Sequence, residues 1–481
     1  MENMSKKLNY KLFWSWDHST NWVLNAPGGQ NSGVANPYTK NPDVFLRDYQ
    51  RAVLWAAEHG INAIGIVGLL RDRHGGVESA RRLCAFAQEH GVRIYIIAGM
   101  YAYGGVYYEG DSPWNLDRFL AENPECMGRN ADGSPLFWQY EGKGGAKCQA
   151  QGCSSSERLN QYVLDSLDWL FTAIPELGGI QMESGDNGVC MCEKCVARRE
   201  RITGAARRGF TAISFADMGR IYPRAVDVIR SRAPKAWLIC ESYSHFLDKC
   251  CQEFFQPANP LPERQALLNM DSDVFWQWKA DYRLADGSWT EADRLPECLR
   301  KFRHVMRAHT GTQWWYGRHT LGIDKIRRQC RLSFTSGLQG VSLFGEGAPF
   351  HANVEFNYLA LDYFANNPFA PVQDFVRDVM APRLGGNEEH AARFIELAEQ
   401  SLSPRLIPDA LLEIAKITSG IKEFEALRRW NWLASFLGSF HWEANQPWHE
   451  PRTEPNARRI KRSDQWDLTA PQSNDSTETP T

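Results

Sequence analysis

The chain has 481 residues, with 54 basic and 57 acidic side chains and a formal net charge of -3. This near balance provides no cationic excess for phosphate backbones or an anionic membrane, so neither nucleic acid nor a membrane is expected as a partner. With 43% hydrophobic and 23% charged residues the composition is globular, which excludes collagen-like, coiled-coil and wholly disordered chains.

The amino-terminal residues contain Lys6 and Lys7 but no apolar segment that could act as an export signal. Later apolar runs are too short to cross a bilayer. Among the 12 cysteines, Cys190, Cys192 and Cys195 are too closely spaced for a disulfide framework, which favours a reducing compartment. We therefore expect a cytoplasmic protein.

Short β-branched or aromatic runs alternate with amphipathic helical stretches along most of the chain. Strands are predicted at residues 11–16, 61–69, 92–99, 179–183, 236–241, 274–278, 312–316 and 341–344. Helices are predicted at residues 42–59, 77–90, 157–174, 210–232, 295–308, 323–336 and 354–364. Eight strands with helices between most of them are typical of an α/β (β/α)8 TIM barrel. A doubly wound sheet is the alternative, but no glycine-rich phosphate-binding turn follows the first strand.

Three regions are predicted from these patterns. Residues 1–368 form the barrel, residues 369–444 a C-terminal helical appendage, and residues 445–481 a disordered tail rich in Pro, Ser, Thr and Asn. The excursion at residues 101–155, between the third and fourth strands, is long enough to be functional and is expected to cover the site.

Polar and aromatic residues gather at the predicted carboxyl ends of the strands, where a barrel carries its chemistry. The carboxylates are Glu183 and Asp186 after the fourth strand, Glu241 after the fifth and Glu346 after the eighth. The expected substrate-binding residues at the same ends are Trp16, Asp17, Tyr101, Tyr243, His245, Trp276, Trp278, Trp314, Trp315, Tyr316, Arg318 and His319. Indole and phenol faces suit sugar rings, although the same rings also fill protein cores.

This combination suits cleavage of a glycosidic bond. One carboxylic acid protonates the leaving oxygen, while a second carboxylate stabilises an oxocarbenium-like centre or activates water. A single Glu in a loop is usually a solvated charge, but carboxylates at three strand ends of one rim are harder to explain without a function. Glu183 is the first candidate, followed by Glu241 and Glu346, with Asp186 as a neighbour.

Cys190, Cys192 and Cys195 form a Cys-x-Cys-x-x-Cys segment directly after the fourth strand. Tetrahedral zinc needs four ligands, and Cys153 in the long excursion is the expected fourth. A site closed by four thiolates is structural, so the zinc would join two loops and leave the reaction to carboxylates. No organic cofactor is expected.

The segments Gly152-Cys153-Ser154-Ser155, Ile180 to Asp186 and Cys190 to Cys195 resemble barrel glycoside hydrolases related to bacterial α-glucuronidases and β-N-acetylhexosaminidases. The resemblance covers about forty residues closely and the remaining barrel only in architecture. It implies that Glu183 is the general acid and that Asp186 orients it or polarises a substrate group.

The chain also departs from these enzymes. Met182 stands where a large retaining clan has Asn, the predicted seventh strand carries no Glu nucleophile, and Glu183 and Asp186 are not adjacent as in the hexosaminidases. Neither a retaining nor an N-acetyl-assisted mechanism is therefore carried over.

Two classes of function remain. The first is an exo-acting glycosidase for a uronide or an N-acetylhexosaminide in an oligosaccharide, with Arg318 and His319 available for a sugar carboxylate. The second is a non-catalytic carbohydrate-binding barrel. A metal hydrolase is a more distant alternative, because His18, His245 and His319 have no ligand spacing in the sequence. The sequence does not define an oligomeric state.

Overall fold

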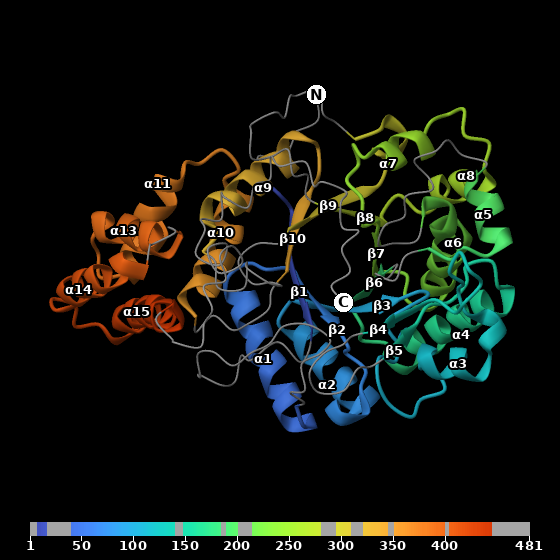
Figure 1. The fold of residues 1–481 in the computed structure, drawn as a ribbon, viewed down its shortest axis with the longest axis horizontal. Helices are drawn as coiled ribbons and strands as arrows, with labels where there is room; N and C mark the ends of the chain where they lie inside the picture. Colours follow the sequence, from blue (N-terminus) through green and yellow to red (C-terminus); the bar gives the residue numbers. More distant parts are fainter. Residues whose placement is uncertain are drawn as a thin grey trace.

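A closed barrel of eight parallel strands forms the centre of the molecule in the computed structural model (Figure 1). The structure describes residues 7–16, 40–139, 148–183, 189–200, 214–279, 295–308, 321–344, 351–399 and 404–444. The barrel strands are β1 (Tyr10–Trp16), β2 (Ala63–Val67), β3 (Arg93–Gly99), β6 (Gly179–Glu183), β7 (Trp237–Glu241), β8 (Phe275–Lys279), β9 (Arg303–Ala308) and β10 (Gly340–Phe344). Their order, β1-β10-β9-β8-β7-β6-β3-β2, closes where β1 pairs with β2. The predicted TIM barrel is confirmed.

Helices follow most strands and surround the barrel (Figure 1). The longer ones are α1 (Pro42–Glu58), α2 (Gly76–Glu89), α4 (Glu157–Ala173), α6 (Phe215–Arg232), α9 (Ile323–Thr335) and α10 (Ala352–Asn366). Shorter helical segments are α5 (Glu193–Glu200), α7 (Lys249–Phe254), α8 (Pro262–Leu268) and the 3-10 turns η1 (Asp72–His74) and η5 (Glu297–Leu299). No helix in the described part of the chain is long and apolar enough to cross a membrane.

Local signals set where these helices begin. The side chain of Asn41 caps α1 by accepting a hydrogen bond from the Val44 amide at 2.8 Å, and Pro42 occupies the first turn. Ser214 and Asp217 form a reciprocal capping box at the start of α6. These caps satisfy backbone amides that the first helical turn leaves without partners.

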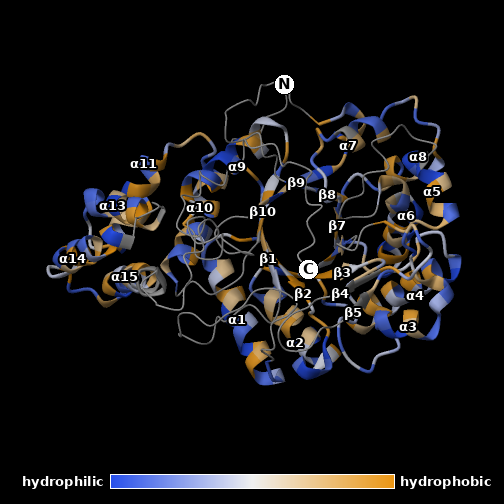
Figure 2. Cartoon of the chain, viewed as in Figure 1, coloured by the Kyte–Doolittle hydropathy of each residue, from blue (hydrophilic) through white to orange (hydrophobic). Residues whose placement is uncertain are grey.

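The pleat of each strand divides its side chains between two hydrophobic clusters. Leu12, Tyr95, Ile239, Phe275 and Val305 belong to the cluster inside the barrel. Alternate residues on the same strands face outward into a larger cluster between the sheet and the helices. Figure 2 accordingly shows hydrophobic strands at the centre and helices of mixed hydropathy around them.

The seventh barrel strand is not where the sequence pattern places it. Residues 295–308 were expected to be helical and residues 312–316 to form the strand, but the structure has η5 followed by β9. Phe302, Val305 and Met306 have the spacing of a helical face, yet β9 pairs with both β8 and β10 and its residues alternate between inside and outside. Residues 312–316 lie outside the described residues.

The excursion between β3 and α4 contains its own small elements. These are α3 (Leu116–Glu122), η2 (Pro124–Cys126) and the antiparallel strands β4 (Phe137–Gln139) and β5 (Cys148–Ala150). Tyr103 and Tyr108 from its first part belong to the cluster inside the barrel. The excursion therefore packs against the carboxyl end of the barrel.

A group of helices follows α10 and lies beside it, away from the strands (Figure 1). It comprises α11 (Val372–Phe375), η6 (Val376–Met380), α12 (Ala381–Arg383), α13 (Glu388–Glu399), η7 (Pro404–Leu406), α14 (Ile407–Thr418) and α15 (Phe424–Ala444). Arg429 on α15 grips both carboxylate oxygens of Glu355 on α10, at 2.7 and 2.9 Å. The expected helices after residue 369 are thus present, while the predicted tail at 445–481 lies outside the described residues.

Candidate active site

Two carboxylates lie at equivalent positions on neighbouring barrel strands. Glu183 is the last residue of β6 and Glu241 the last of β7, and the register pairs Met182 with Cys240 immediately before them. Both side chains are buried, with 3% and 0% of their surface exposed. The structure therefore brings these two predicted residues together at the carboxyl end of the barrel, as neighbours in the sheet.

Three amide groups hold the two carboxylates in place. Gln181, two residues before Glu183, donates from Nε2 to its Oε1 at 2.6 Å. Gln277 on β8 donates from Nε2 to Oε2 of Glu241, and the backbone amide of Tyr243 donates to Oε1 at 2.9 Å. At Glu241, where donors approach both oxygens, these hydrogen bonds favour the ionised form of the carboxylate.

Arg307 on β9 is the cation beside this pair. Its Nη1 atom lies 3.6 Å from Oε2 of Glu241, and its side chain is only 6% exposed. Burial raises the pKa of Glu241, while the charge of Arg307 and the hydrogen bonds from Gln277 and Tyr243 act in the opposite direction. We call Gln181, Glu183, Glu241, Gln277 and Arg307 the inner polar cluster.

Sequence reasoning missed Arg307, Gln181 and Gln277. Arg307 fell in a segment interpreted as helix, and the two Gln residues were treated as ordinary strand positions. The sequence nevertheless contains a signal for these residues. Polar residues at alternate positions of a strand that is otherwise apolar and buried mark the face that is turned toward other polar groups.

Tyr243 shows a backbone conformation that is rare for a residue with a side chain. Its φ of 51° lies in the left-handed region. Such strain persists where the surrounding structure compensates it and is concentrated at functional sites. Here the turn after β7 directs the Tyr243 amide toward Glu241 and sets the phenol ring 4.5 Å from the Arg307 guanidinium.

Aromatic residues from β1 lie inside the barrel near the inner polar cluster. Trp14, which was not predicted as a site residue, lies 4.6 Å from the Arg307 guanidinium. Trp16, which was predicted, makes edge contacts with Tyr103 and Tyr108, each with ring centroids 5.9 Å apart. Trp16 belongs to the cluster inside the barrel and is 6% exposed.

Trp276 and Trp278 do not face the inside of the barrel, and their prediction as sugar-binding residues is corrected. Both side chains are fully buried between β8 and the helices, where the two rings stack at 5.5 Å. The indole of Trp278 donates to Nδ1 of His304 at 3.0 Å, and burial lowers the pKa of His304 to about 4, so the neutral ring can accept. The pleat turns Gln277 inward and the two Trp residues outward.

Tyr101 is likewise a core residue. It has no exposed surface, and its hydroxyl donates to Oδ1 of Asn160 on α4 at 2.7 Å. His245 is 1% exposed in the turn after β7, where its Nδ1 accepts from the Leu247 amide at 3.1 Å. The structure thus places Tyr101 away from the inner polar cluster and uses Nδ1 of His245 to hold the turn.

Several predicted site residues are not described by the structure. They are Asp17, Asp186, Trp314, Trp315, Tyr316, Arg318, His319 and Glu346, and His18 of the metal-hydrolase alternative is also among them.

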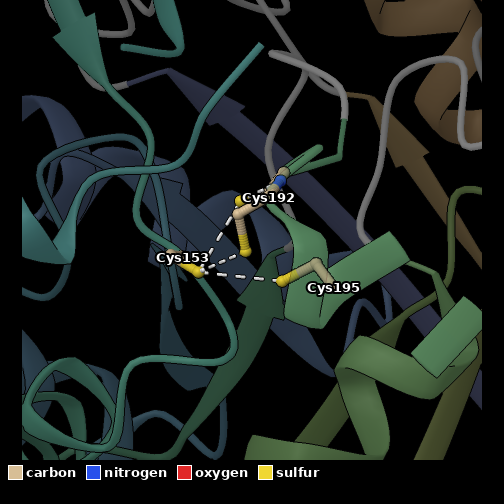
Figure 3. Close-up of side chains that lie close together, drawn as sticks. Cys153, Cys192 and Cys195 are labelled. Carbon is tan, nitrogen blue, oxygen red and sulfur yellow. Dashed lines mark hydrogen bonds between the residues drawn. The ribbon is translucent and has the colours of Figure 1, made fainter. Parts of the chain in front are cut away.

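The four predicted cysteine ligands do come together, and we call them the cysteine cluster. The sulfur atoms of Cys153, Cys190, Cys192 and Cys195 all lie within 4.8 Å of one another. The sulfur of Cys153 is 3.7 Å from those of Cys192 and Cys195 (Figure 3). It is 3.6 Å from the sulfur of Cys190. Four thiolates at about 2.3 Å from a tetrahedral zinc have sulfurs about 3.8 Å apart, so the cluster fits the ion.

Donors surround the sulfur atoms of the cysteine cluster. The amides of Arg129 and Cys192 donate to Sγ of Cys190 at 3.3 and 3.5 Å. Nη2 of Arg198 lies 3.4 Å from Sγ of Cys195 and also donates to Oδ1 of Asp217 at 2.6 Å. Such outer contacts stabilise thiolate charge and orient ligands in metal sites. The cluster joins the excursion before α4 to the segment after β6.

Comparisons with known proteins identify no family for this chain. No family model matches it, and no curated protein matches it. Among solved structures, Eubacterium rectale Amy13B is similar over 75% of this chain and 79% of its own, with 7% identity and a TM-score of 0.44. The cyclic α-maltosyl-(1→6)-maltose hydrolase of Arthrobacter globiformis in its ligand-free form covers 74% and 82%, with 11% identity and a TM-score of 0.42. A maltogenic α-amylase from Thermotoga neapolitana covers 74% and 76%, with 9% identity and a TM-score of 0.41.

Proposed function

We propose that this protein is a glycoside hydrolase in which Glu183 and Glu241 form the catalytic pair. The observation that carries the proposal is their position at the carboxyl ends of neighbouring strands, on the inner face of a TIM barrel. Hydrolysis of a glycosidic bond needs two such carboxyl groups directed at one site. Active sites of TIM barrels lie at this end of the strands.

Glu241 takes the anionic role, as nucleophile or general base. Donors approach both of its oxygens, Tyr243 at Oε1 and Gln277 at Oε2, and Arg307 adds a positive charge beside Oε2. A protonated carboxyl could neither attack the sugar nor remove a proton from water, so this environment suits the role. Glu183 then acts as the general acid that protonates the leaving oxygen.

Adjacent strands favour the shorter of the two carboxyl separations used by glycosidases. Neighbouring strands lie about 4.8 Å apart. Retaining enzymes hold their carboxyl groups about 5–5.5 Å apart, whereas inverting enzymes leave about 6.5–9.5 Å for a water. We therefore propose net retention of anomeric configuration, with Glu241 as the nucleophile.

The substrate we propose is an oligosaccharide cleaved from one end, with a uronide or an N-acetylhexosaminide at the scissile position. Arg318 and His319 would hold a uronate carboxylate, since a guanidinium can grip it with two hydrogen bonds. Trp16 would contact a sugar ring, while Asp186 and Glu346 would assist the pair or bind hydroxyls.

The test is a screen of aryl glycosides that includes uronides and N-acetylhexosaminides, with product anomers followed by NMR. Hydrolysis of one class supports the proposal, and the first-formed anomer decides between retention and inversion. Saturable binding of an oligosaccharide without turnover would instead support the non-catalytic carbohydrate-binding barrel.

We also propose that the cysteine cluster holds one structural zinc ion. The support is the set of sulfur separations of 3.6 to 3.7 Å, together with the donors around the sulfurs. Bound there, the zinc would fasten the excursion to the segment after β6 and leave the reaction to the carboxylates. Elemental analysis of protein purified without chelator should find about one zinc per chain. Finding none, with the thiols reduced, would overturn the assignment.

A further inference from the structure

Arg307 occupies an unusual place for a charged residue. It projects from β9 into the barrel, where the neighbouring inward position on the strand is Val305, and only 5% of it is exposed. Burying a guanidinium costs considerable free energy unless an opposite charge or a hydrogen-bonding partner compensates it. The position of Arg307 therefore requires a local explanation.

The side chain is held between two aromatic rings and directed at one carboxylate. Its guanidinium carbon lies 4.6 Å from the centre of the Trp14 ring and 4.5 Å from that of Tyr243. Its Nη1 atom lies 3.6 Å from Oε2 of Glu241. The rings restrict the guanidinium to this direction and shield the pair from water, which strengthens the attraction between the charges.

We propose that Arg307 is a positioning residue that keeps Glu241 ionised at neutral pH. This inference rests on the proposed function, in which Glu241 must be an anion. Burial raises the pKa of Glu241, and an opposite charge within about 4–6 Å lowers a carboxyl pKa by about one to three units. Arg307 thus offsets the effect of burial on the residue that has to attack or accept a proton.

The other titratable groups around Glu241 would not supply this charge. Glu183 on β6 carries a carboxyl group, which cannot be positively charged. The remaining groups are phenols, which cannot be positively charged either: Tyr95 on β3, Tyr222 on α6 and Tyr243 in the adjoining turn. Among these groups and Arg307, only Arg307 is a cation. The pKa of Arg307 is itself raised, because the phenol of Tyr243 and the carboxyl groups of Glu241 and Glu183 outweigh the effect of burial, so Arg307 stays protonated.

The test that does not depend on activity is a double-mutant cycle in thermal stability. Arg307→Met leaves a buried carboxylate without its counter-ion, so at pH 7 the Tm should fall by roughly 3–5 °C. In the double variant Glu241→Gln/Arg307→Met the neutral amide needs no counter-ion, so most of that loss should be recovered. If Arg307→Met fails to fold while the double variant folds, this rescue supports the proposal in the same way as a recovery of Tm.

The pH dependence has a definite sign. Without Arg307, the pKa of Glu241 in the folded state rises further above its value in the unfolded state. A carboxyl group with a raised folded-state pKa stabilises the fold at pH values below its unfolded pKa, and this stabilisation is lost as the pH rises through the folded-state pKa. The loss of Tm in Arg307→Met should therefore be smaller at pH 5 than at pH 7. In an active enzyme, the acid limb of kcat/KM should move up by about one to three pH units, with Arg307→Lys showing a smaller shift.

Arg303 offers a matched control on the same strand. It occupies an inward position at the opposite end of β9, with its guanidinium 5.3 Å from the ring of Phe275. Arg303→Met removes an arginine without touching Glu241, so Glu241→Gln should recover none of its loss. The inference would be overturned, even in an active hydrolase, if Glu241→Gln restored no Tm to Arg307→Met, or if it restored the same Tm to both arginine variants. Strong coupling in a protein that hydrolyses no glycoside would sustain the ion pair and reject the proposed function instead.

Discussion

The phenolic oxygen of Tyr222 lies 3.2 Å from the main-chain carbonyl oxygen of Glu241 and 2.9 Å from that of Met182. Helix α6 is therefore attached to the ends of β6 and β7, next to both candidate catalytic residues. Tyr222→Phe should lower the free energy of unfolding by about 1 kcal/mol, because the contact is fully buried, and should reduce kcat more than it raises KM. Urea unfolding and steady-state kinetics measure the two effects. An unchanged kcat would show that this attachment does not position the pair.

Trp278 is predicted to contribute to stability rather than to substrate binding. Trp278→Ala should cost about 3–5 kcal/mol, because it empties a fully buried position between β8 and the helices. The milder variant Trp278→Phe should leave KM unchanged. Trp16→Phe, inside the barrel, is the comparison and should raise KM. A higher KM in Trp278→Phe, with normal unfolding, would contradict the placement of this residue.

Loss of one zinc ligand should affect both metal content and stability. Cys195→Ser should reduce zinc to well under one ion per chain and lower the Tm, since metal binding at a closed site contributes folding free energy. Cys84→Ser is the control, because Cys84 is a buried thiol outside the cysteine cluster. Equal zinc content in the two variants, measured by elemental analysis, would exclude the cluster as the binding site.

The identity of the second carboxylate can be tested by chemical rescue. Glu241→Ala should lose more turnover than Glu346→Ala, and added azide should partly restore Glu241→Ala by replacing the missing carboxylate. The glycosyl azide formed would be identified by NMR. Rescue of Glu346→Ala instead would reverse the roles, and full activity in both variants would reject the mechanism.

Much of the barrel could be predicted from the sequence because its strands are short apolar runs bounded by helices. Glu183 and Glu241 were found because each ends such a run, and β6 was predicted with the bounds that the structure has. Cys153 was chosen as the fourth ligand by counting thiols, and the structure places it with the other three.

The direction of side chains was harder to predict. Strands in a parallel barrel are covered on both faces, so apolar residues occur on both and the pattern does not say which way Trp276 or Trp278 points. Arg307 was missed for a related reason. Its strand carries apolar residues at helical spacing, and only pairing with β8 and β10, between residues distant in the sequence, selects the extended conformation.

The central claim is that Glu183 delivers a proton to a glycosidic oxygen, and one comparison tests it most directly. Turnover of a glycoside with an unactivated leaving group should be measured for the wild type and for Glu183→Gln, which keeps the shape of the side chain but cannot supply the proton. We predict a loss on the order of a hundredfold or more, with an unchanged circular dichroism spectrum. A substrate with an acidic phenol as leaving group should show a much smaller loss, because it departs without protonation. Wild-type turnover of the unactivated glycoside by Glu183→Gln would contradict the account.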